Sequence, residues 1–166
     1  SPIIFIKERM KNKLKTLLVA VTIAALSACG DGASDVADAF IGKWKSKCFA
    51  YKAQDGNTYY QTGTTNLSKD SAAQLTANYS NAVAHSDSAC SNILGNITSA
   101  SSIKISIGAE TVFLGLQSKE IVATYQDGNA RRGYIAVDNE RLFIVVTDDS
   151  GEKPFTWGRS SPYTKL

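Results

Sequence analysis

The sequence predicts an all-β protein, a small antiparallel up-and-down β-barrel of about eight strands preceded by a short N-terminal helical turn. Two observations indicate this fold. Short segments rich in β-branched and aromatic residues recur along the chain, and most of them are bounded by Asp-, Asn- and Gly-rich turns. In addition, no long segment behind the leader has the period of an amphipathic helix. A β-sandwich is the alternative that the same pattern allows.

A secretory leader precedes the predicted strands. A basic segment at residues 10–15 is followed by an apolar segment at 17–26, which is too short to span a bilayer as a stable anchor. We therefore expect a signal peptide over 10–28 and set aside residues 1–9 as a non-native or over-called start. A buried core helix or a simple signal anchor is the alternative for 14–28.

The leader ends in Leu26-Ser27-Ala28-Cys29, which resembles the lipobox of bacterial lipoproteins. The resemblance implies cleavage before Cys29, a lipid on its thiol and attachment to a membrane of the cell envelope. Gly30 follows, so the Asp that retains enteric lipoproteins at the inner membrane is absent; by resemblance this favours the outer membrane, facing the periplasm or the surface. We expect 29–33 to be a lipidated tether and 34–166 a single barrel domain.

Charge excludes one class of partner. The whole chain has 18 basic and 15 acidic residues, but five of the basic and one of the acidic residues precede Cys29. The part from Cys29 onward therefore has 13 basic and 14 acidic residues. This balance provides no basic field for counterion release, so we expect no nucleic-acid partner.

The two cysteines that remain after Cys29 is assigned to lipid are Cys48 and Cys90. In an oxidising compartment they predict a disulfide, and the chain-entropy model gives the loop of about 40 residues roughly 4 kcal/mol of stabilisation. Two buried free thiols are the alternative. The chain has a single histidine and no close cysteine pair, so we expect no metal site and no cofactor.

The N-terminal elements follow in order. Ser34 is expected to cap a helical turn over 36–41 that Gly42 ends. A strand then begins, with Trp44 on its inner face. The outward residues of this strand are Lys43, Lys45 and Lys47.

Seven further strands complete the barrel, and tight hairpins join the last four. The least regular part, 80–100, is expected to be a loop-rich crossing that the disulfide holds to the first strand; 70–76 could instead form a helical turn. Gly115 and Gly133 suggest bends or bulges within strands. The predicted strands cover 58–65, 74–79, 102–107, 111–116, 121–125, 132–137 and 142–147.

The sequence Phe40-Ile41-Gly42-Lys43-Trp44 resembles the start of lipocalin-like barrels of the calycin group. The resemblance implies that Gly42 lets the chain pass under the barrel, that Trp44 plugs its closed end, and that Arg159 is the partner of Trp44. Neither the later Thr-Asp-Tyr element of lipocalins nor the biotin-binding set of avidins is present, so the ligand stays open. Trp44 could also be an ordinary core aromatic.

No catalytic site is predicted. His85 lies in a polar segment beside Ser86 and Asp87, which we expect to be a solvated loop, because neighbours in sequence rarely assemble a triad. Carboxylate pairs at 138–140 and 148–149 have the pattern of turns. Aromatic residues could form a binding groove or an interface, although most have the pattern of ordinary strand residues. They are Tyr51, Tyr59, Tyr60, Tyr79, Tyr125, Tyr134, Trp157 and Tyr163.

These expectations favour a non-enzymatic, membrane-anchored envelope protein that binds a small apolar ligand or another envelope protein. Two alternatives share the same architecture. One is an inhibitor similar to the periplasmic lysozyme inhibitors, and the other is a structural component of envelope assembly.

Overall fold

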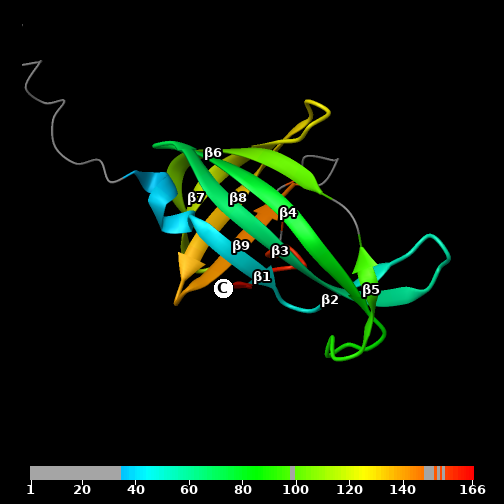
Figure 1. The fold of residues 1–166 in the computed structure, drawn as a ribbon. Helices are drawn as coiled ribbons and strands as arrows, with labels where there is room; N and C mark the ends of the chain where they lie inside the picture. The colour runs from blue at the N-terminus through cyan, green and yellow to red at the C-terminus, as the bar shows by residue number, and fades with distance from the viewer. Residues whose placement is uncertain (1–34, 98–99, 148–151, 153, 155) are drawn as a thin grey trace, which may run out of the picture. The chain divides into compact units, whose positions relative to one another are not determined.

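The computed structural model describes residues 35–97, 100–147, 152, 154 and 156–166. They form one short 3-10 helix, η1 (Val36–Phe40), and ten strands in a single antiparallel sheet (Figure 1). The strands are β1 (Gly42–Ser46), β2 (Phe49–Lys52), β3 (Thr58–Ser71), β4 (Gln74–His85), β5 (Ile93–Ile97), β6 (Ser101–Phe113), β7 (Leu116–Thr124), β8 (Ala130–Asp138), β9 (Arg141–Val146) and β10 (Tyr163–Lys165).

Eight of these strands close into a barrel. In chain order, β1, β3, β4, β6, β7, β8, β9 and β10 each pair with the next, and β10 pairs with β1. This is the up-and-down order that the sequence predicted, so the all-β barrel is confirmed and the sandwich alternative is wrong. The predicted helical turn is confirmed as η1, whereas its proposed cap, Ser34, lies outside the described residues.

The remaining two strands build an extension beyond the barrel. β3 pairs with β1 through residues 64–67 and with β2 through 58–61, while β4 pairs with β6 through 74–79 and with β5 through 82–85. β2, β3, β4 and β5 therefore form a four-stranded extension at the end of the barrel away from η1 (Figure 1).

One local prediction and one alternative are wrong here, whereas the strand predicted over 74–79 is found within β4. The expected loop-rich crossing over 80–100 contains the end of β4 and all of β5, and the segment 70–76 is a β3–β4 hairpin rather than a helical turn. The small polar residues of this segment have low strand propensity, but hydrogen bonding to the adjacent strands outweighs that preference. The first strand is also divided, because β1 ends at Ser46 and β2 begins at Phe49.

The glycines that suggested bends have different roles. Segments 102–107 and 111–116 contribute to one long strand, β6, with a bulge between Ile107 and Glu110. Gly115 has a φ of +80° in the β6–β7 turn, which favours glycine. Gly133 lies within β8, where a Cβ would be 2.0 Å from the carbonyl oxygen of Val145, so the two backbones approach too closely for any side chain.

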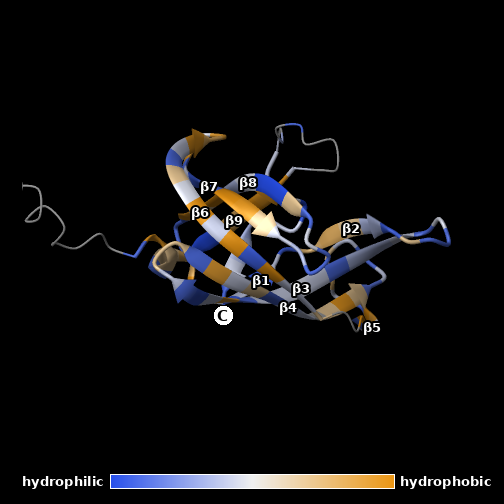
Figure 2. Ribbon diagram, turned by 90° about the horizontal axis from the view of Figure 1, so that it is seen from above, coloured by the Kyte–Doolittle hydropathy of each residue, from blue (hydrophilic) through white to orange (hydrophobic). Residues whose placement is uncertain are grey.

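The hydrophobic core fills the η1 end of the barrel. Apolar and polar residues alternate along the strands, as Figure 2 shows, and the inward residues meet beneath η1. Ala37 and Phe40 of η1 are buried over this layer. The core residues from the strands are Trp44, Leu67, Leu75, Ala77, Ile105, Ile107, Ile121, Ile135, Leu142 and Tyr163.

Candidate ligand-binding cavity

A cavity of about 760 Å³ opens at the end of the barrel opposite η1. Its position follows from its lining, because Ser101 begins β6, Tyr125 follows β7, and Thr147 follows β9, all at the strand ends away from η1. Small-molecule sites in proteins commonly have volumes of about 300–1,000 Å³. The core described above closes one end of the barrel and leaves the other end open.

The inner wall of the cavity is aliphatic. It is formed by inward residues of three strands, β6, β7 and β9, and none of these residues carries a charge. Such a surface favours an apolar ligand, because its burial removes roughly 25 cal/mol of unfavourable hydration per Å². The aliphatic residues are Ile103, Ile105, Ala123, Ile144 and Val146.

Three tyrosines add polar groups to this wall. Tyr79, Tyr125 and Tyr163 all line the cavity. Tyr125 and Tyr163 lie close enough to Tyr79 that their charge raises its pKa. Burial is the main reason that the pKa of Tyr79 lies far above its ordinary value, although its ring keeps some exposed surface where it faces the cavity. The raised pKa keeps the Tyr79 hydroxyl protonated at neutral pH, so it can donate or accept a hydrogen bond.

Tyr163 is tied to the segment that precedes β10. Its hydroxyl and that of Ser160 are 2.6 Å apart. Burial raises the pKa of Tyr163, and the hydrogen bond with Ser160 opposes that shift. Tyr163 therefore connects the buried core layer with the wall of the cavity.

The segment 156–161 forms one side of the mouth. The Gly158 N–H donates to the carbonyl oxygen of Ile144 at 3.2 Å, and the Ser161 hydroxyl donates to the same oxygen at 2.9 Å. Trp157 packs edge-on against Phe113 at 4.9 Å between ring centroids, and Phe113 stacks on Tyr134 at 4.2 Å. These contacts fix the segment beside β9 and hold Trp157 at the rim.

Two arginines line the cavity. The guanidinium carbon of Arg131 lies 5.3 Å from the centroid of the Tyr125 ring, within the range of a cation–π contact. Arg159 is exposed and also contributes to the lining. Glu152 also lines the cavity, which therefore combines an aliphatic wall, tyrosine side chains and charged residues of both signs.

The predicted partner of Trp44 is corrected by this arrangement. The cation over the Trp44 ring is Lys165, with its Nζ 5.4 Å from the ring centroid, whereas Arg159 lies in the cavity lining. The order of residues suggested Arg159, but Lys165 is the direct partner of Trp44 in the β1–β10 register. Gly42, with a φ of +140°, places the chain next to Lys165 at the closed end.

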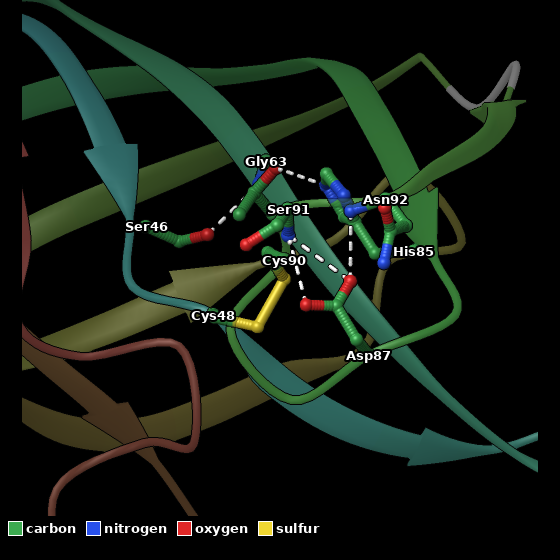
Figure 3. Close-up of a disulfide and its surroundings, with 9 residues drawn as sticks. Ser46, Cys48, Gly63, His85, Asp87, Cys90, Ser91 and Asn92 are labelled. Carbon is green, nitrogen blue, oxygen red and sulfur yellow. Dashed lines mark hydrogen bonds between the residues drawn. A yellow bond between two sulfur atoms is a disulfide. The ribbon is translucent and has the colours of Figure 1, made fainter.

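The disulfide joins the barrel to the extension. Cys48, between β1 and β2, is bonded to Cys90, in the loop before β5, with 5.8 Å between their Cα atoms (Figure 3). The predicted disulfide is thus seen in the structure, in place of two free thiols. Beside it, the Ser46 hydroxyl accepts a hydrogen bond from the Gly63 N–H at 2.8 Å, which satisfies the backbone where β1 gives way to β2.

His85 lies in the extension, and its predicted place in a solvated loop is wrong. It is the last residue of β4, is only 5% exposed, and its Nε2 lies 3.2 Å from the Thr62 hydroxyl (Figure 3). Its Nδ1 is buried without a partner among the described residues. Asp87 serves the neighbouring turn, where its carboxylate accepts from the N–H groups of Ser91 and Asn92.

Two further expectations, the lipid at Cys29 and the turn at 148–149, lie outside the described residues. The turn predicted at 138–140 is found between β8 and β9, where Asn139 and Glu140 have positive φ angles. Within the described ranges, no group of three or more His, Cys, Asp or Glu could hold a metal ion. In the same ranges, no helix has both the length and the apolar character needed to cross a membrane.

Comparison of the chain with protein-family models, curated proteins and solved structures found no match. The sequence identified Tyr79, Tyr125, Trp157 and Tyr163 only as members of a longer aromatic list. It missed Arg131 and the aliphatic wall. The alternation of apolar residues along β6, β7 and β9 could have indicated that wall, once the end of the barrel that Trp44 closes was known.

Proposed function

We propose that this protein is a lipid-anchored component of a bacterial cell envelope whose barrel binds a small, largely apolar ligand. The observation that carries the proposal is the open cavity of about 760 Å³, with an aliphatic wall and three tyrosines in its lining. The lipobox at Cys29 supports the location, with the outer membrane favoured by Gly30. Binding needs no cofactor, and the role is not enzymatic.

The chemistry of the cavity limits the ligand. An aliphatic or aromatic body would contact Ile103, Ile105 and Ala123, and one or two polar groups would reach the tyrosine hydroxyls. A strongly hydrated sugar or an ion would leave its hydration shell without enough compensating hydrogen bonds. We therefore favour a hydrophobic molecule with few polar groups.

A fluorescence titration with N-phenyl-1-naphthylamine, a neutral apolar probe, tests the proposal. The full-length protein should bind about one probe molecule, and Ala123→Trp, which fills the inner wall, should abolish binding. Val122→Trp is the matched control, because Val122 is 39% exposed on the neighbouring outward position of β7. Equal binding by both variants would place the probe outside the barrel, and no binding by the parent would refute a ligand cavity.

Protein binding is the second candidate, and the edge of the extension favours it. Ile93 and Leu94 of β5 are 70% and 57% exposed. β5 pairs with β4 on one side and has no paired strand on the other side among the described residues. Unprotected apolar edges are sites where another chain can add a strand.

A photo-crosslinking residue at Leu94, used in intact envelopes, would test this second role. A single abundant crosslinked protein would support a structural or inhibitory role, and a separate lysozyme inhibition assay would distinguish the two. Crosslinks no stronger than those from an exposed position such as Lys52 would argue against both.

A further inference from the structure

Three lysines form a stripe on the outer wall of the barrel. Lys43, Lys45 and Lys47 are exposed, while the alternating residues Trp44 and Ser46 are 1% and 6% exposed. Lys43 and Lys45 are alternate residues of β1, and Lys47 directly follows the strand, so the same alternation places the three side chains on its outer side. We call these three residues the lysine stripe.

Nearby acidic groups do not neutralise the lysine stripe. Among the described residues, none of these three lysines takes part in an ion pair. The register partners beside the stripe are uncharged: Thr164 lies across from Lys45 on β10, and Asn66 and Thr64 lie across from Lys43 and Lys45 on β3. The stripe is therefore a local positive surface on a chain whose charges nearly balance from Cys29 onward.

The chain that precedes η1 sets how far this surface can be from a membrane. Asp35, the first described residue, follows Cys29 by six positions, and six extended residues span at most about 20 Å. Asp35 and Asp38 both pair with Lys69 of β3, which fixes the start of the domain at the closed end of the barrel. Gly42 and Lys43 begin β1 at the same end. An anchor at Cys29 thus keeps the stripe near the lipid headgroups.

We propose that the lysine stripe binds the anionic phospholipids of the membrane to which Cys29 is attached and holds the barrel with its β1 side against the surface. The inference rests on the proposed lipid anchor. Charge complementarity and the short tether both favour this occupant. Each lysine near an anionic membrane surface raises the membrane-binding constant roughly fivefold, so three lysines raise it on the order of 100-fold. A barrel lying on this side opens its cavity beside the headgroups.

Lysine acetylation of the full-length acylated protein tests the proposal. In vesicles that contain phosphatidylglycerol, Lys43, Lys45 and Lys47 should acetylate at least about fivefold more slowly than in vesicles of neutral phosphatidylcholine. Exposed Lys52, on β2, is the internal control and should react equally in both. High salt should remove the protection, because it screens charges at this distance.

The possible failures are distinguishable. If mass spectrometry finds no acyl group on Cys29, both the anchor and this inference are refuted. If Cys29 is acylated but the stripe reacts as fast as Lys52 in phosphatidylglycerol vesicles, only the inference is overturned. Protection in native envelopes without protection in vesicles would mean that a protein covers the wall, and would also overturn the lipid assignment.

Substitutions provide the second arm of the experiment. A nitroxide at Asn66→Cys, beside Lys43, should become less accessible to a water-soluble relaxation agent when the parent is in phosphatidylglycerol vesicles. The triple variant Lys43→Gln, Lys45→Gln, Lys47→Gln should lose this change. A control that removes the same charge elsewhere, Lys52→Gln, Lys104→Gln, Lys119→Gln, should keep it. Equal behaviour of the two triple variants would refute a specific role for the stripe.

Discussion

The indole N–H of Trp44 donates a hydrogen bond to the carbonyl oxygen of Phe40, with 2.9 Å between Nε1 and the oxygen. This bond joins the end of η1 to β1 underneath the barrel, where Phe40 is 4% and Trp44 1% exposed. Phe40 is the last residue of the 3-10 helix, so its carbonyl has no further helical partner. The Trp44 ring therefore fills the closed end and also satisfies a buried helix terminus.

Trp44→Phe should destabilise the protein by roughly 2–4 kcal/mol, because it removes buried ring area and leaves the Phe40 carbonyl without its donor. Urea unfolding monitored by circular dichroism measures the change. Trp157→Phe is the matched control, since Trp157 lies at the half-buried rim and donates no hydrogen bond in the described contacts. Similar losses for the two variants would contradict the assigned role of Trp44.

The sequence predicts the barrel well where local and global patterns agree. Strands 121–125, 132–137 and 142–147 alternate cleanly and have turns of Asp, Asn and Gly between them. The β7–β8 turn shows the mechanism, because the Asp127 carboxylate accepts from the Asn129 N–H at 2.9 Å, a bond that also lowers the pKa of Asp127. Tight hairpins leave few topologies open.

The extension could not be predicted from local pattern. Segment 80–85 has weak strand propensity, and its strand structure depends on pairing with β3 on one side and β5 on the other. His85 is an example. Its polar neighbours in sequence suggested a loop, but the pairing of β4 with β3 buries His85 against Thr62. The cavity could not be predicted either. Alternation of apolar residues shows which side chains point into a barrel, but not whether they fill it along its whole length.

Removal of the disulfide by Cys48→Ala with Cys90→Ala should lower the free energy of unfolding by up to about 4 kcal/mol while the barrel remains folded. The reason is the loop of 42 residues that the bond closes between the barrel and the extension. Guanidinium unfolding of the double variant and of the parent, with and without a reductant, measures the effect. A reductant that leaves the parent unchanged would show that the bond contributes nothing.

Gly133→Ala should be among the most damaging single substitutions, because the added Cβ would lie 2.0 Å from the Val145 carbonyl oxygen, and β8 and β9 would have to separate. Gly63→Ala and Gly95→Ala are matched controls, since a Cβ at either position meets no atom within 4 Å. We expect loss of soluble protein or a large fall in melting temperature for Gly133→Ala alone. Comparable melting temperatures for all three would contradict the close approach of the strands.

Alkaline pH should destabilise the protein through the buried tyrosines of the cavity. Burial raises the pKa of Tyr79 and of Tyr163 above the value of 10.0 that a free tyrosine has. The native state therefore keeps both phenolic protons at pH values where the unfolded chain has lost them. With more protons bound in the native state, the free energy of unfolding falls as pH rises above about 10, and below that pH these groups add no pH dependence.

Melting temperatures between about pH 9 and pH 12 measure this dependence, and Tyr79→Phe should flatten the curve by removing one titrating group. Lys69 contributes to the same decline, because its ion pairs with Asp35 and Asp38 raise its pKa and that stabilisation is lost when it deprotonates. The comparison of variant with parent removes this shared contribution and isolates Tyr79. Parallel curves for parent and Tyr79→Phe would mean that the Tyr79 hydroxyl is solvated, which would contradict its burial in the cavity wall.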